Sequence, residues 1–174
     1  MKENYQIIET DKELNIIIKK KPNWLVLIMT GLWLIHWVVI ITIIFYGIIT
    51  DPEKFDEELF FAIFIMIVVG LLILKIFLWN LKGKEIVTIN NNELIIKKAG
   101  TILSFPSKYK IDYLENISIT ENTTTPKWIK TMGLGGGQIE FIYLDNIKYF
   151  GQSLNDMDSS KIIQKMKQFV FNKK

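Results

Sequence analysis

The sequence predicts a membrane protein in which a hairpin of two transmembrane helices carries a small α+β domain. Two apolar runs, Trp24–Ile49 and Leu59–Leu81, each exceed the roughly 20 residues that cross the apolar core of a bilayer. After the second run, short stretches of strand-like alternation lead to a final amphipathic helical pattern. We therefore expect three parts: a strand-hairpin segment over residues 1–21, the helical hairpin 22–81 with its acidic connector 50–58, and a domain over 82–174.

The first apolar run is expected to remain as an anchor and not to be cleaved as a signal peptide. About twenty polar and strand-like residues precede it, and it is longer than the roughly 7–15 apolar residues of a signal peptide. At 1.5 Å per residue it would extend about 39 Å, which exceeds a bilayer core of about 30 Å. We expect this helix to tilt or to project from the membrane.

Lysines flank the ends of the two runs that lie away from the connector. They are Lys19, Lys20, Lys21, Lys75, Lys82 and Lys84. The connector holds Lys54 among five acidic residues. Because basic residues in short loops stay in the cytoplasm, we expect both termini to be cytoplasmic and the connector to lie outside. The six lysines are also candidates for contact with anionic lipid headgroups, although their role in orientation alone would explain them.

Short strands with turn signals between them fill the chain after the hairpin. They are Glu85–Asn90, Glu93–Lys98, Thr101–Ile111, Leu114–Thr120, Gln138–Leu144 and Ile147–Phe150. Pro106 interrupts the third strand, which we expect to be an edge strand or a bend. In the fourth, we expect the isoleucines to face inward and the hydroxyl residues, including Thr120, to face outward. A short turn at Asp145-Asn146 should join the last two strands.

Strand patterns also precede the hairpin, at Tyr5–Glu9 and Glu13–Lys19. The orientation above places them on the same side of the membrane as the C-terminal domain. We expect this N-terminal strand pair to join or pack against the C-terminal sheet.

The last part of the chain is predicted to be a helix with one apolar stripe. The residues of the stripe are Ile162, Ile163, Met166, Phe169 and Val170. Asp156 and Asp158 lie near the predicted start, and Lys173 and Lys174 near the predicted end, as the helix dipole favours.

Several strands followed by one amphipathic helix, directly after a two-helix hairpin, resemble the bacterial pleckstrin-homology-like (PH-like) membrane proteins. The resemblance is carried by Ile86–Asn90 with Glu93–Lys98, Tyr113–Ile119, Ile139–Tyr143, Phe150-Gly151 and the helix through Ile162–Phe169. It implies a PH-like barrel or sandwich of antiparallel strands, a bacterial inner-membrane location, and a role in binding or assembly. It brings no catalytic residues, and it does not imply phosphoinositide binding.

The stretch Thr123–Gln138 combines exposed-type apolar residues, lysines and glycines. Lys127, Trp128, Ile129 and Lys130 form a candidate loop for contact with a partner or the bilayer. Alternatively, Trp128 covers the core of the domain. The glycines do not form a phosphate-binding loop, because no Lys-Ser or Lys-Thr follows them.

Composition leaves little chemistry for catalysis. The chain has no cysteine and no arginine, which removes thiolate chemistry and the bidentate recognition of phosphate and guanine. His36 is the only histidine, and we expect it to be neutral and hydrogen-bonded to a threonine or the backbone. The acidic connector lacks the spacing of a calcium loop. We expect no enzymatic activity, no catalytic residues, no metal or cofactor, and no nucleic-acid partner.

The sequence therefore predicts a non-enzymatic, membrane-anchored PH-like module for binding or assembly at the inner leaflet. Its expected partners are membrane lipids and a membrane protein or a second copy of the chain. The alternative is a subunit of a larger transport or assembly complex, in which the hairpin makes the main contacts.

Overall fold

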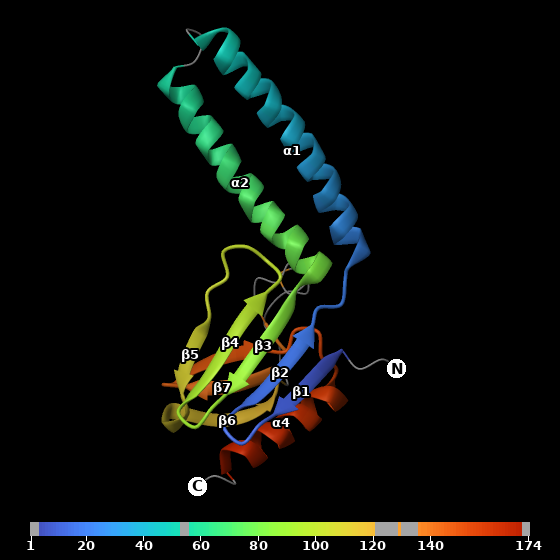
Figure 1. Cartoon of the computed structure of the whole chain (residues 1–174), viewed down its shortest axis with the longest axis vertical. Helices are drawn as coiled ribbons and strands as arrows, with labels where there is room; N and C mark the ends of the chain where they lie inside the picture. The colour runs from blue at the N-terminus through green and yellow to red at the C-terminus, as the bar shows by residue number, and fades with distance from the viewer. Residues whose placement is uncertain (1–3, 53–55, 121–128, 130–135, 172–174) are drawn as a thin grey trace.

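The computed structural model describes residues 4–52, 56–120, 129 and 136–171. Two long helices, α1 and α2, form a hairpin at one end of the molecule (Figure 1). Strands β1 to β8 and helix α4 form a β domain at the other end. The predicted combination of a helical hairpin and a small α+β domain is confirmed.

The helices of the hairpin are α1 (Trp24–Thr50) and α2 (Glu57–Lys82), of 27 and 26 residues. Both are long and apolar enough to cross a membrane. Each begins at a side chain that accepts a hydrogen bond from the first turn: Asn23 Oδ1 from the Val26 amide and Asp56 Oδ1 from the Leu59 amide.

A tryptophan packed on a glycine joins the two helices. The indole N–H of Trp37 in α1 donates to the Met66 carbonyl in α2 over 3.1 Å. A Cβ atom at Gly70 would lie 2.3 Å from the Trp37 ring, so only glycine leaves room for the indole. Nearer the β domain, Gly31 faces the ring of Phe77. The helices are therefore held together by aromatic rings placed against small residues.

One antiparallel sheet contains five strands in the order β1-β2-β3-β4-β5. Their bounds are Tyr5–Glu9, Leu14–Lys19, Lys84–Ile89, Glu93–Ala99 and Ser107–Lys110. The N-terminal pair joins the sheet because β2 pairs with β3 along its whole length, from Leu14 opposite Ile89 to Lys19 opposite Lys84. β5 begins directly after Pro106 and forms an edge. The joining of the N-terminal strands and the edge position of β5 are confirmed, but only Ser107–Lys110 of the predicted strand Thr101–Ile111 is a strand.

The second antiparallel sheet has the order β6-β7-β8, with bounds Leu114–Ile119, Ile139–Tyr143 and Asn146–Phe150. A 3₁₀ turn, η2 (Ile111–Tyr113), leads into it from the first sheet. The pairing of β6 with β7 is irregular between Glu115 and Ser118, where Asn116 has a φ of 44°. Ile117 and Ile119 pack against the core as predicted, but Thr120 is buried, although the sequence predicted it to face outward. The turn between β7 and β8 is Leu144-Asp145, both with positive φ, one residue earlier than predicted.

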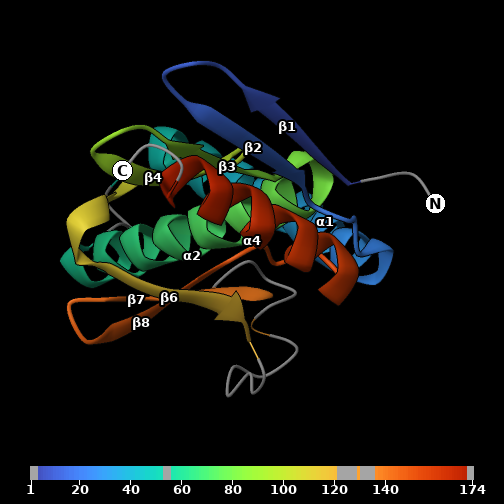
Figure 2. The ribbon, with the colours of Figure 1, turned by 90° about the horizontal axis from the view of Figure 1, so that it is seen from below.

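Helix α4 (Asp156–Phe171) lies across the open side between the two sheets (Figure 2). Its predicted apolar stripe packs on a core that both sheets share. The most deeply buried core residues are Leu14, Ile16, Ile18, Val87, Ile89, Leu94, Ile139, Phe141, Phe150, Ile162 and Met166. Over the described residues the strands form two separate antiparallel sheets and no closed barrel, so the barrel form of the predicted barrel or sandwich is not seen. The chain leaves the first sheet at η2, and α4 lies between the two sheets.

Candidate functional site

The junction between the hairpin and the first sheet brings together most of the lysines predicted from the sequence. Four residues separate the end of β2 at Lys19 from the start of α1, whereas Gly83 alone separates α2 from β3. Lys19 lies opposite Lys84 in the sheet, and the Lys20 amide donates to the Gly83 carbonyl over 2.9 Å. The two connections to the hairpin therefore run side by side.

Gly83 makes the tight connection between α2 and β3 possible. Its φ of −61° is open to any residue, so the requirement is steric. A Cβ atom here would lie 2.2 Å from the Trp79 carbonyl oxygen and 2.6 Å from the Trp79 ring. The Gly83 amide donates to that same carbonyl over 3.0 Å. The sheet is thus joined to the helix without a flexible linker.

One side of the last turn of α2 is covered by protein. Trp79 is 3% exposed and Asn80 is fully buried. The Lys98 ammonium lies 5.3 Å from the centre of the Trp79 ring, within the range of a cation–π interaction. The Asn80 amide donates to the Ile76 carbonyl, while its oxygen has no hydrogen-bond partner among the described residues. This end of the apolar run therefore belongs to the β domain as well as to the hairpin.

A buried carboxylate, Glu85, lies directly below this turn. It points to the core side of β3, where Ile18 and Lys98 are its neighbours on the adjoining strands. It accepts hydrogen bonds from the amides of Gly151 at 2.5 Å and Gln152 at 3.4 Å. Since residues 151 and 152 follow β8, Glu85 connects the first sheet to the segment between the second sheet and α4.

Burial raises the pKa of Glu85, and the positive charge of Lys98 and the two amide donors oppose that rise. Burial also lowers the pKa of Lys98 and of Lys20, and the Glu85 charge opposes both shifts. The folded state holds the Glu85 proton to a higher pH than the unfolded chain does. Glu85 therefore favours folding most below its ordinary pKa, and this contribution is lost as the pH rises through the folded pKa.

The predicted lysines are not equivalent in the structure. Lys19, Lys21, Lys82 and Lys84 are exposed at the junction, whereas Lys20 is half-buried there. Lys75 lies earlier in α2, away from the junction, and its ammonium donates to the Leu103 carbonyl over 3.1 Å. Of the predicted loop, Ile129 is half-buried, and Lys127, Trp128 and Lys130 lie outside the described residues. Contact of these groups with lipid or a partner stays a prediction.

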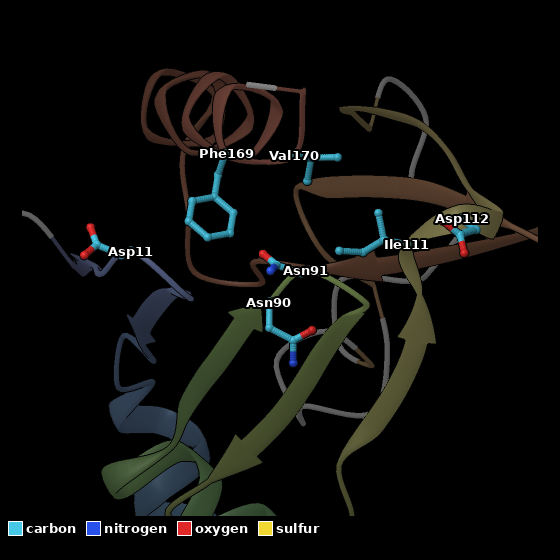
Figure 3. Close-up of a pocket in the computed structure, with 7 residues that line it drawn as sticks. All are labelled: Asp11, Asn90, Asn91, Ile111, Asp112, Phe169 and Val170. Atoms are coloured by element: carbon cyan, nitrogen blue, oxygen red, sulfur yellow. The ribbon is translucent and has the colours of Figure 1, made fainter. Parts of the chain in front are cut away.

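A hollow of about 460 Å³ lies at the end of the β domain farthest from the hairpin. Four separate segments line it, with Asp11, Asn90, Asn91, Ile111, Asp112, Phe169 and Val170. Phe169 projects from α4 toward Asn91, and the two aspartates lie on opposite sides (Figure 3). Such an arrangement gives an acidic rim and an apolar wall, but it does not give a close pair of carboxylates for acid–base catalysis.

Two other groups singled out in the sequence lie in the helical hairpin, away from the junction and the hollow. His36 lies in the middle of α1 with its side chain exposed. Asp56 of the connector caps α2. Within the described residues, no group of three or more histidine, aspartate or glutamate side chains is placed to hold a metal ion.

Sequence reasoning missed Glu85 and the distal hollow. A signal for Glu85 was present, because the alternation of β3 places it on the same face as Val87 and Ile89, which are both buried. No local signal pointed to the hollow, whose lining comes from turns far apart in the chain. No family model, no curated protein and no solved structure matches this chain.

Proposed function

We propose that this protein is a non-enzymatic binding or assembly module that a helical hairpin anchors at the inner leaflet of a bacterial cytoplasmic membrane. In this proposal both helices cross the bilayer, both termini are cytoplasmic, and the β domain is a PH-like module. Two antiparallel sheets of short strands with a C-terminal helix packed on their shared core support the PH-like assignment.

The observation that carries the proposal is the direct continuation of both helices into neighbouring strands of one sheet. β2 leads to α1 and α2 leads to β3, while β2 and β3 pair with each other. A domain on a flexible linker would sample many orientations. A domain joined at two adjacent points, one of them a single buried glycine, keeps one orientation to the hairpin. Fixed orientation serves a module that must present one surface to a partner.

The distal hollow is the surface that this orientation presents to the aqueous phase. It opens at the end of the β domain away from the hairpin, so the membrane would not cover it. Its acidic rim and apolar wall suit a partner segment that carries basic and apolar side chains. A partner held in the same membrane would meet it at a high effective concentration.

A single-cysteine labelling experiment tests the anchoring, because the natural chain has no cysteine. Cysteine would be placed at Asn91, on the rim of the hollow, and at Glu58, at the connector end of α2; both side chains are exposed. In sealed vesicles, a membrane-impermeant maleimide should label the two positions from opposite sides. Labelling of both positions from the same side would exclude a spanning hairpin.

Photo-crosslinking tests the binding surface. A benzoylphenylalanine at Asn91 should capture a partner in native membranes, and the same residue at exposed Asn146, in the second sheet, provides the control. A product specific to Asn91 supports the hollow as the binding surface. Equal products at both positions, or none at Asn91, contradict it.

One observation favours the alternative, a subunit that contacts its partners through the hairpin. His36 is exposed halfway along α1, where a two-helix hairpin alone would leave an imidazole in lipid. A third helix from a partner would cover it. If His36→Leu disrupts co-purification of a membrane protein and Asn91→Trp does not, the hairpin is the contact surface.

A further inference from the structure

The loop between β4 and β5, residues 100–106, climbs along the last two turns of α2 (Figure 1). At its base, a Cβ atom on Gly100 would lie 2.2 Å from the Lys82 carbonyl. Higher up, the Thr101 hydroxyl donates to the Lys75 carbonyl over 3.0 Å, and the Lys75 ammonium donates to the Leu103 carbonyl over 3.1 Å. Lys75 precedes Lys82 by about 10 Å along the helix axis.

The 100–106 loop turns its polar groups toward the protein and its apolar groups outward. The hydroxyls of Thr101 and Ser104 both donate to backbone carbonyls, of Lys75 and Lys98. Leu103 is 57% exposed and Phe105 is 82% exposed. Leu103 also has a φ of 50°, a conformation that is costly for a residue with a Cβ atom. A loop that faces water would expose its polar side chains and bury its large apolar ones.

The two hydrogen bonds between the loop and Lys75 set the depth of these apolar side chains relative to the membrane. From Glu57 to Lys75 the helix rises about 27 Å, close to the thickness of a bilayer core. If the core ends at Lys75, Leu103 lies at the boundary between headgroups and acyl chains. If the core extends farther toward Lys82, Leu103 lies deeper. Either register places the tip of the loop in contact with lipid once α2 spans the membrane.

We propose that the 100–106 loop inserts Leu103 and Phe105 into the headgroup–acyl boundary of the leaflet that faces the β domain. The ligand is the phospholipid leaflet itself, which covers the two exposed side chains. Exposed Lys82 lies at the base of the loop and would meet lipid phosphates. This third attachment, together with the two helices, would fix the tilt of the β domain to the membrane plane. The inference rests on the proposed function, because it requires a spanning hairpin.

Depth measurements with a fluorophore on single cysteines test this proposal. The dye nitrobenzoxadiazole would be attached at Phe105→Cys or Leu103→Cys, in vesicles of phosphatidylcholine and phosphatidylglycerol. Ile8→Cys is the matched control, because Ile8 is also apolar and 50% exposed but lies on β1 next to the turn remote from the hairpin. All three side chains are exposed, so the labels do not disturb the core.

We expect the emission at positions 103 and 105 to shift to the blue and to be quenched severalfold by lipids with a spin label near the headgroup. The label at position 8 should show neither effect. The proposal would be overturned if the label at position 105 showed the same water-like emission as the label at position 8. It would also be overturned by a blue shift without quenching by spin-labelled lipid, because that result indicates contact between protein copies. Labelling Glu58→Cys and Asn91→Cys in the same vesicles shows whether the hairpin spans the membrane. A spanning hairpin without loop insertion overturns only this inference, whereas a hairpin that does not span overturns the proposed function as well.

Discussion

Replacing Gly83 by alanine should loosen the joint between α2 and the sheet. The new methyl group would lie 2.2 Å from the Trp79 carbonyl oxygen, about 1 Å inside ordinary contact distance. The carbonyl cannot easily retreat, because Trp79 is 3% exposed and the same oxygen accepts the Gly83 amide. Overpacking of this kind costs about 2–3 kcal/mol of folding free energy.

Thermal unfolding in mild detergent, followed by the β-sheet circular dichroism signal, measures this cost. For a chain of 174 residues, the expected loss lowers the Tm by roughly 5–10 °C. Gly31→Ala is the matched control, because a Cβ atom there meets the Phe77 ring at 3.4 Å, an ordinary contact. An unchanged Tm for Gly83→Ala, equal to that of the control, would show that the joint is not tightly packed.

Three further changes follow from the same contacts. Glu85→Gln keeps an oxygen that can accept the Gly151 amide but carries no charge. The Tm of this variant minus the Tm of the natural chain should therefore increase as the pH is raised from about 4.5 to 8. A Tm difference independent of pH would contradict the raised pKa of Glu85. Deleting residues 1–20 removes two strands and exposes the edge of β3, so the β domain should lose its cooperative melt; a normal melt of the truncated chain would refute this. Trp37→Phe removes the hydrogen bond to Met66 and should cost about 1 kcal/mol in helix-hairpin stability, measured by detergent-induced unfolding; no change would mean that the indole N–H contributes nothing.

Much of the fold follows from local patterns in the sequence. The strand Tyr5–Glu9, the apolar runs and the stripe of α4 all appear where alternation or helical periodicity placed them. That the N-terminal strand pair joins or packs against the C-terminal sheet was expected, because the lysine distribution predicted both to lie on one side of the membrane; the pairing of β2 with β3 itself was not predicted. Periodicity identifies such elements because burial of one face is a local property of the chain.

The features that failed prediction depend on contacts between distant segments. An irregularity in pairing between Glu115 and Ser118 interrupts a strand that the sequence pattern predicts to be regular, and Thr120 is buried. The sequence predicted the 100–106 loop to be part of a strand interrupted by Pro106. Its hydrogen bonds with Lys75 are tertiary contacts, which leave no local pattern in the sequence. Closure of a barrel likewise depends on strand pairing across the whole domain, which periodicity does not report.

The fixed orientation of the β domain to the hairpin is most directly tested by one distance distribution. Spin labels on Glu58→Cys and Asn91→Cys lie at opposite ends of the molecule and would be measured by pulsed electron–electron double resonance in lipid nanodiscs. A rigid joint at Gly83 and the pairing of Lys19 with Lys84 predict a single narrow distribution. A broad or bimodal distribution would mean that the domain moves freely on its hairpin, which would contradict a module held in one orientation.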